Sequence, residues 1–394
     1  MAATYSFQER LGHRFRKQQS FSLEVSPLYA RLNGMVAGWL TEADHPVSRW
    51  LVAASRGRSS FEVPMLLMAG VHRLVLAGRP EAGALAGFFP TAGGRFSAGG
   101  DGAELESLFS RTILDAAEEL TRFISTATVQ TNETGRGLCW LVPLASLPWE
   151  QVRLVELGAS AGLNLLADQR HYQLRDIRSG QTFAALGRGQ APQFQVACSS
   201  APGNWVGQER LPQISSRLGC DLAPWPLSSR EDELSLAAFI WGDQVERLAR
   251  LEEGIQAFRR FQGRQGGLRV LPADLPRELT PFLEEQLPAE PSCPVVLYAS
   301  YLSRYLADKG ASLRPLIAAW AGKHATEVLW LQLDIAPAGP AGLRPPQLGW
   351  LLWQADLWQQ GRHHHWDLGW CHPHGSTVWW LPGMEQWLSF WTTA

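Results

Sequence analysis

The chain has 394 residues, of which 45% are hydrophobic and 18% are charged, and its formal net charge is -2. This length exceeds what one compact core usually takes and predicts two domains, while the composition excludes a disordered or fibrous protein. A net charge near zero supplies no field that attracts nucleic acid or an anionic membrane, so we expect neither as a partner.

The cysteines and the apolar segments indicate in which cellular compartment the protein is expected. The five cysteines form no C-x-x-C pair, which argues against a disulfide scaffold and against a structural zinc site. The first residues show no apolar signal core, and the longest apolar stretch, residues 65–77, is too short to span a bilayer. We therefore expect a soluble cytoplasmic protein, and its oligomeric state stays open.

The first part of the chain, residues 1–148, predicts a helical domain. Pro64 stands where a helix begins, and Gly78 follows as a stop signal. Between residues 104 and 126, apolar residues recur at helical spacing. A Gly-rich loop at residues 93–102 separates these segments, and we find no run of alternating strands here.

From residue 149 to residue 394, the pattern predicts alternating strands and helices. The expected strands lie at residues 152–157, 218–222, 268–271, 294–299 and 327–334, and the expected helices at 231–261, 276–286 and 311–321. Residues 171–216 lack helical periodicity and are expected to form an insertion of short strands and loops. The tail from Trp350 is expected to form paired extended strands. This alternation predicts a mainly parallel sheet covered on both faces, which binds ligands at the carboxyl ends of its strands.

A glycine-rich loop follows the first of these strands. The sequence Gly158-Ala159-Ser160-Ala161-Gly162 predicts a strand, a tight turn and then a helix. In such a turn, backbone N–H groups approach an anionic or polar ligand closely, and the helix N-terminus adds partial positive charge.

The loop and the acid before it resemble the first motif of class I S-adenosylmethionine methyltransferases. By this resemblance Gly158 and Gly162 flank the methionine portion of the cofactor, with Glu156 near its ammonium group. Asn164, just beyond the loop, belongs to the same expected cofactor site, and Ser160 stands where the motif has its middle glycine. S-Adenosylmethionine is therefore the cofactor we expect.

Two rival interpretations of the loop stay open. The same residues spell G-x-S-x-G, the nucleophile elbow of α/β-hydrolases, with Ser160 as nucleophile and His374 as base. A hydrolase elbow normally follows several strand–helix units, whereas here a long helical region precedes it, which favours a cofactor loop. The other rival is a non-catalytic nucleotide-binding protein.

Two aspartates follow later strands. In the methyltransferase architecture, the acid after the second strand receives the ribose hydroxyls and the acid after the third strand faces the adenine amine. By this resemblance, Asp221 matches the first of these acids and Asp274 the second. Asp221 lies much further from the loop than the usual ~20 residues, so the assignment needs the insertion at 171–216. Each is equally well explained as a helix cap or turn residue.

Further polar residues are candidates for the substrate pocket. Asn132, Glu133 and Arg136 lie just before the first strand, where they form either a lid that meets a ligand or a polar hinge. Ser300 and Tyr301 follow the fourth strand, which in many methyltransferases faces the methyl acceptor. Methylation of an exocyclic base amine is not expected, because the usual Asn/Asp-Pro-Pro-aromatic group is missing there.

The tail is rich in histidine and tryptophan. Three adjacent histidines at 363–365 would point to alternate faces of a strand, so we expect an exposed strand rather than a metal site. His374 is the histidine we retain as a candidate general base. Nine of the eighteen tryptophans lie between residues 350 and 391, where packing is a better explanation than a substrate pocket.

Several strings spread over almost the whole chain resemble one bacterial family defined only as a domain of unknown function, number 2332. The strings lie at residues 26–29, 72–78, 90–94, 130–136, 157–165, 219–224 and 373–375. The resemblance implies a methyltransferase-like core, an N-terminal helical region and no settled activity.

Together these observations predict an α/β protein with a class I methyltransferase-like (Rossmann-like), doubly wound sheet in residues 149–394. Residues 1–148 would form a helical domain that caps the ligand cleft, and residues 171–216 a β-rich insertion. The function we expect is S-adenosylmethionine-dependent methylation of a small molecule.

Overall fold

The computed structural model describes residues 6–42, 44–100, 102–129, 133–190, 194–203, 205, 210–262, 267–287, 293–324, 326–335 and 344–392. The chain forms two compact units. The helical unit comprises Met1–Asn132 and Leu227–Leu251, and the sheet unit comprises Glu133–Pro226 and Glu252–Ala394. No helix in the described part of the chain is long and apolar enough to cross a membrane.

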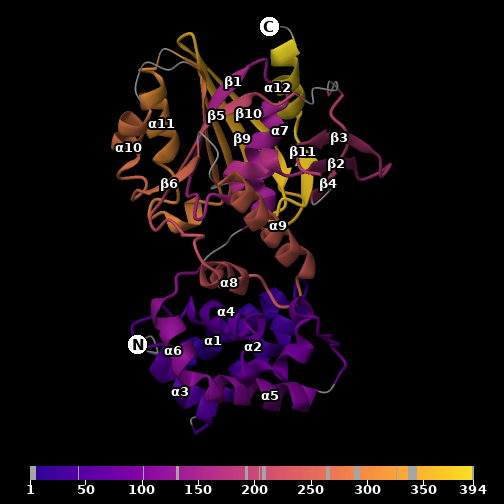
Figure 1. Ribbon diagram of the computed structural model, residues 1–394, viewed down its shortest axis with the longest axis vertical. Coiled ribbons are helices and arrows are strands. Elements are labelled where there is room, and N and C mark those ends of the chain that lie inside the picture. Colours follow the sequence, from indigo (N-terminus) through magenta and orange to yellow (C-terminus); the bar gives the residue numbers. More distant parts are fainter. Residues whose placement is uncertain are drawn as a thin grey trace. The chain divides into compact units, whose positions relative to one another are not determined.

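The helical unit is built from α-helices and short 3-10 turns (Figure 1). Its helices are α1 (Phe7–Ser22), α2 (Pro27–Trp39), α3 (Pro46–Ala54), α4 (Val63–Leu76), α5 (Gly102–Asp115), α6 (Ala117–Thr126), α8 (Arg230–Ala238) and the first part of α9 (Val245–Phe261). Its turns are η1 (Pro80–Ala82), η2 (Leu85–Phe88) and η3 (Pro90–Ala92). The helical pattern expected at residues 104–126 is confirmed, although it is divided into two helices.

Polar contacts hold the segment 227–251 in the helical unit. His72 Nε2 lies 2.8 Å from Thr91 Oγ1, and Thr91 Oγ1 donates to the carbonyl of Gly242 at 2.8 Å. Asp243 accepts from Ser26 Oγ at 2.5 Å and from the Leu28 amide at 3.2 Å, at the start of α2. Three of the family strings therefore serve to attach this returning segment, which is a structural role.

The sheet unit contains one mixed sheet of eleven strands, in the order β3-β2-β4-β11-β10-β9-β8-β7-β1-β5-β6 (Figure 1). The strands are β1 (Gln151–Leu157), β2 (Tyr172–Asp176), β3 (Thr182–Leu186), β4 (Phe194–Cys198), β5 (Gln213–Asp221), β6 (Leu268–Pro272), β7 (Val295–Ser300), β8 (Val328–Asp334), β9 (Leu351–Gln359), β10 (Arg362–Cys371) and β11 (Thr377–Trp380). Strands β6, β5, β1, β7 and β8 are mutually parallel neighbours, and β9 and β10 continue the sheet as antiparallel strands.

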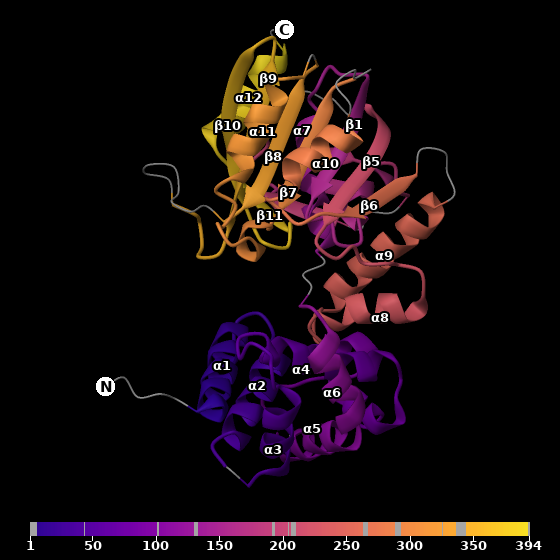
Figure 2. The same ribbon diagram turned by 90° about the vertical axis from the view of Figure 1, so that its left-hand side faces the viewer.

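Helices cover both faces of this sheet. Leu154 on β1 belongs to a core shared with Trp140 of α7 (Leu138–Leu144) and Trp387 of α12 (Pro382–Thr392). The next residue, Val155, belongs to a second core with α10 (Leu279–Gln286) and α11 (Leu313–Ala321). Figure 2 shows α10 and α11 lying over β7 and β8. Because successive strand residues face opposite sides, a nearly continuous apolar run such as β7 indicates burial on both faces.

The sheet unit departs from the expected organisation in three places. The segment 171–216 does contain short strands, but β2, β3 and β4 extend the same sheet at its far edge through β11. The tail holds the expected antiparallel strands, and it ends in the helix α12, which the sequence pattern did not predict. In the structure, the helical unit gives way to the sheet unit between residues 132 and 133, and α7 lies in the core of the sheet unit. The sequence pattern suggested this boundary between residues 148 and 149.

Candidate functional site

The glycine-rich loop turns sharply at the carboxyl end of β1. Gly158 and Gly162 have positive φ angles of 77° and 73°, and Ser160 has a positive φ of 49°. The amides of Gly158 and Ala159 donate to the Cys220 carbonyl at 2.8 and 2.9 Å. The Ser160 amide donates to Asp221 Oδ2 at 2.8 Å. The end of β5 therefore braces the loop.

The helix expected after this loop is not formed, and that prediction was wrong. A kinked 3-10 segment, η5 (Leu163–Gln169), follows instead. The Asn164 carbonyl accepts from Trp140 Nε1 at 2.8 Å, and the Leu165 carbonyl accepts from Arg217. These bonds tie the segment to α7 and β5, and in the described part of the chain no α-helix directly follows the loop that could turn its N-terminus to a ligand.

The backbone amides of the loop were expected to face a ligand, but most of them bond within the protein. Besides the three amides held by the end of β5, the Gly162 amide donates to the Ala159 carbonyl at 2.7 Å. Four amides of the loop therefore have partners inside the protein. The loop does not present them as a row of donors for an anionic ligand.

Glu156 is a buried carboxyl group at the end of β1. Its side chain is 2% exposed, and it lies opposite Tyr298 of β7 on one side and Gly219 of β5 on the other. Burial raises the pKa of Glu156 to about 8, and this shift is opposed by Tyr298, Arg136 and Asn164. Glu156 Oε2, Tyr298 Oη and Asn164 Oδ1 are buried in one neighbourhood, and side-chain hydrogen bonds from Tyr298 and Asn164 to Glu156 limit the rise of its pKa. A buried carboxyl group with a strongly raised pKa is typical of a ligand site.

Glu133 and His374 form a second feature of this region. His374 Nδ1 lies 3.0 Å from Glu133 Oε2, and the Glu133 side chain is only 3% exposed. The Gly135 amide donates to Glu133 Oε1 at 3.2 Å, and Asn164 Nδ2 donates to the Glu133 carbonyl at 3.3 Å. Residues far apart in the sequence, which we singled out separately, therefore meet here.

Glycines make this meeting sterically feasible. A Cβ atom on Gly135 would lie 2.4 Å from the His374 carbonyl oxygen, and one on Gly375 would lie 2.6 Å from the Gly135 carbonyl oxygen. The turn η4 (Thr134–Gly137) and the turn at 373–375 are therefore in direct backbone contact. Side chains at either glycine would separate them.

Arg136 lies buried beside the end of β7. It donates to the Ser300 carbonyl at 3.0 Å, and its guanidinium lies 5.4 Å from the centre of the Tyr301 ring. Burial lowers the pKa of Arg136, while the charge of Glu133 raises it. Tyr301 itself has a positive φ of 60°, so the chain is strained just beyond the strand end.

Asp334, at the end of β8, is a site residue that sequence reasoning missed. It is 3% exposed and accepts from the amides of Leu302 and Ser303 at 3.0 and 2.8 Å and from Ser303 Oγ at 2.6 Å. Burial raises the pKa of this carboxyl. Its place at a strand end was visible in the sequence, but its bonds to the segment after β7 were not.

The other expected site residues divide as follows. Asp221 lies at the loop, where both carboxylate oxygens accept backbone amides, from Ser160 and from Ala223. Asp274 is 45% exposed and pairs with Arg277 at 3.2 Å, as a turn residue would. Asn132 lies outside the described residues, and so its expected role stays a prediction.

The histidine and tryptophan residues of the tail have structural partners. His363 and His365 both lie 2.9 Å from Oδ1 of the fully buried Asp356, whereas His364 stacks with Trp366, so the expected alternation of faces is confirmed. Within the described ranges, no group of three potential ligands could hold a metal ion. Several of the tryptophans, among them Trp353 and Trp387, fill the core of the sheet unit.

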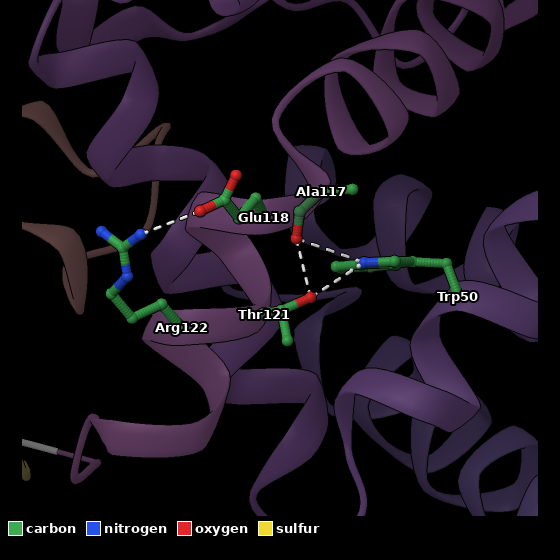
Figure 3. Close-up of a pocket in the computed structure, with 5 residues that line it drawn as sticks. All are labelled: Trp50, Ala117, Glu118, Thr121 and Arg122. Atoms are coloured by element: carbon green, nitrogen blue, oxygen red, sulfur yellow. Dashed lines mark hydrogen bonds and ion pairs between the residues drawn. The ribbon is translucent and has the colours of Figure 1, made fainter.

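A shallow hollow on the helical unit is lined by Trp50, Ala117, Glu118, Thr121 and Arg122 (Figure 3). The indole N–H of Trp50 donates to the Ala117 carbonyl at 3.3 Å and to Thr121 Oγ1 at 3.1 Å. Glu118 and Arg122 form an exposed ion pair at 3.2 Å. Because these polar groups bond one another and none belongs to a motif, we assign the hollow no function.

One protein family matches most of the chain. Residues 12–380 match the model of a family described as an uncharacterized protein conserved in bacteria, DUF2332. No curated protein matches the chain.

Proposed function

The chain belongs to the DUF2332 family, and we propose that it is an S-adenosylmethionine-dependent methyltransferase acting on a small molecule. The observation that carries this proposal is the carboxyl group of Glu156, which is buried at the end of β1 opposite Tyr298 of β7 and has a pKa raised to about 8. A cationic ligand beside this carboxyl group would favour its ionised form. S-Adenosylmethionine offers two cations, an ammonium and a sulfonium.

The order of the parallel strands supports a ligand at this position. Taken in chain order, β1, β5, β6, β7 and β8 occupy the sheet as 3-2-1-4-5, the order of doubly wound nucleotide-binding sheets. Such sheets bind ligands at the carboxyl ends of the strands, where the strand order reverses, which here is between β1 and β7. Glu156 and Tyr298 lie on the two strands that border this point. A Rossmann-like methyltransferase fold is part of the proposal.

The charges around the loop favour a cation over a phosphate. Loops that bind phosphate offer their backbone amides to it, whereas here four loop amides already have partners. Glu156, Asp221 and Asp334 place carboxyl groups at the ends of β1, β5 and β8. A phosphorylated dinucleotide would meet this acidic edge with few donors, and so S-adenosylmethionine is the better match.

The roles of the protein groups follow from these contacts. Glu156 would hold the ammonium group. Asp221 would receive the ribose hydroxyls, because each of its carboxylate oxygens accepts one amide and can accept another bond. The bound donor supplies an electrophilic methyl group. The protein's contribution is to align the acceptor with it and to exclude water.

A serine hydrolase is the second candidate function, and one observation favours it. Ser160 has a positive φ, as the serine of a strained nucleophile elbow does, and a histidine–carboxylate pair exists in the same unit. This alternative predicts covalent labelling by a fluorophosphonate and loss of labelling in Ser160→Ala. It gives no role to the buried carboxyl group of Glu156.

Calorimetric titration with S-adenosylhomocysteine tests the proposal. Wild-type protein should bind, and Glu156→Gln should bind roughly tenfold to hundredfold more weakly, because it loses a bond between opposite charges. Glu150→Gln, a change on the exposed residue just before β1, is the matched control and should bind like wild type. No binding by folded wild-type protein at millimolar ligand would overturn the proposal. Binding without turnover on any acceptor would instead indicate a non-catalytic nucleotide-binding protein.

A further inference from the structure

The pair formed by Glu133 and His374, called the dyad below, places a carboxylate next to an imidazole. The carboxylate lies 3.0 Å from Nδ1 of the imidazole and is almost fully buried, whereas a third of the histidine side chain is exposed. A carboxylate at Nδ1 favours the neutral tautomer that carries its proton there. In that tautomer the lone pair lies on Nε2, the nitrogen that can accept a proton from a substrate.

The dyad is held in place by the backbone around it. Glu133 also accepts the Gly135 amide at 3.2 Å, and the His374 amide donates to His372 Nδ1 at 3.3 Å. The close contact between Gly135 and the turn at 373–375 fixes the two strings against each other. A base whose position is fixed in this way loses little conformational entropy when it reaches the transition state.

Contacts connect the dyad to the proposed donor site. Asn164 donates to the Glu133 carbonyl at 3.3 Å and also lies near Glu156, whose pKa it lowers. Arg136 interacts electrostatically with both Glu133 and Glu156. The dyad and Glu156 therefore belong to one connected group of side chains in the sheet unit.

We propose that His374 is the general base for methyl transfer, that Glu133 positions it, and that the acceptor is the hydroxyl group of an alcohol or a phenol. This inference rests on the methyltransferase function proposed above. The O–H bond of the acceptor breaks and its proton moves to Nε2 of His374. The oxygen electron pair forms the new O–CH3 bond while the donor's C–S bond breaks and leaves its electron pair on sulfur.

The chemistry of the acceptor explains why a base is needed. A hydroxyl keeps its proton at neutral pH and becomes a strong nucleophile only as that proton leaves. A neutral amine has its lone pair available before the transfer, and a carboxylate is already ionised. The carboxyl groups of Glu156, Asp221 and Asp334 at the strand ends also disfavour an anionic acceptor.

The first test measures the tautomer of His374 by ¹⁵N NMR and needs no acceptor. The neutral imidazole of wild-type protein should carry its proton on Nδ1. In Glu133→Leu the proton should shift to Nε2, and Glu133→Asp should restore the wild-type tautomer. An Nε2–H tautomer in wild-type protein, or no difference between wild type and Glu133→Leu, would overturn the role of Glu133.

The second test compares methylation of phenol with that of 4-nitrophenol at a pH where only 4-nitrophenol is ionised. His374→Ala should slow methylation of phenol roughly 100-fold or more and leave that of 4-nitrophenolate within a few fold, because only phenol needs a base. His13→Ala, at an exposed position in α1, is the control. Equal losses for both phenols, or no loss, would overturn the role of His374.

Two further outcomes separate this inference from the proposed function. If wild-type protein binds S-adenosylhomocysteine but methylates neither phenol nor simple alcohols, the hydroxyl acceptor is overturned while the donor site stands. If it does not bind S-adenosylhomocysteine, the methyltransferase function fails and this inference fails with it. Labelling of Ser160 by a fluorophosphonate would then support the serine hydrolase alternative.

Discussion

Glu156 on β1 lies directly opposite Tyr298 on β7, at the point where the order of the parallel strands reverses. Both side chains are buried, and burial raises the pKa of each of them. A hydrogen bond between the two side chains opposes part of the rise in the pKa of Glu156. Burying a carboxyl group is costly for the fold, and this one lies where doubly wound sheets bind ligands.

The stability of the protein should fall with rising pH because of Glu156. Its pKa is about 8 in the folded protein and near its ordinary value of 4.5 in the unfolded chain. Between these values the folded state holds more protons, so the free energy of unfolding decreases as pH rises from about 4.5 to about 8 and levels off above. Each pH unit in this window contributes at most about 1.4 kcal/mol.

Urea denaturation at pH 5, 6, 7 and 8 measures this effect. Glu156→Gln cannot ionise, so its stability relative to wild type should increase steadily across the series. Glu150→Gln should keep the wild-type dependence, because its side chain is exposed. Parallel curves for wild type and Glu156→Gln would show that the carboxyl group of Glu156 is not responsible.

The affinity for S-adenosylhomocysteine should rise with pH over the same window. The ammonium group of the ligand prefers the ionised carboxylate, and below about pH 8 that carboxyl must first lose its proton. The association constant should therefore increase about tenfold per pH unit at most and reach a plateau near pH 8. Calorimetry in two buffers of different ionisation enthalpy should detect the released proton at pH 6 to 7, and Glu156→Gln should abolish both effects.

Asp221 and Asp274 should differ in their contribution to stability. Asp221 accepts the Ser160 amide at 2.8 Å and the Ala223 amide at 3.0 Å, and Asp221→Ala should destabilise the protein by about 1–3 kcal/mol. Asp274 is 45% exposed and its ion pair with Arg277 should contribute less than about 1 kcal/mol. Equal losses for both alanine variants in urea denaturation would contradict the bracing of the loop by Asp221.

Gly135→Ala should disturb the dyad through backbone contact alone. The added Cβ would lie 2.4 Å from the His374 carbonyl oxygen, and the overpacking should cost about 1–3 kcal/mol in thermal unfolding. The ¹⁵N signals of His374 should also lose the Nδ1–H tautomer. Gly38→Ala in α2 is the control, because no atom lies within 4 Å of its added Cβ and its stability should rise slightly. An unchanged tautomer in Gly135→Ala would mean that the two turns do not hold the dyad.

The sequence by itself determined most elements and the location of the loop. Short apolar runs bounded by turn residues predicted β1, β6, β7 and β8 to within a few residues, and Pro64 and Gly78 predicted α4 as its start and stop signals. These signals are local, because the spacing of apolar residues along an element shows which of its faces are buried. The same holds for the glycine-rich loop, whose positive φ angles at Gly158 and Gly162 require glycine.

Only the tertiary structure decided how these pieces act together. The segment after the loop is a kinked 3-10 segment whose carbonyls accept bonds from Trp140 and Arg217 of other elements, contacts that its own residues do not predict. Glu133 and His374 meet because Gly135 allows two turns to touch, and Glu156 lies opposite Tyr298 because β1 and β7 pair in parallel. Such contacts depend on strand order and on packing between residues more than 200 positions apart, which no local pattern encodes.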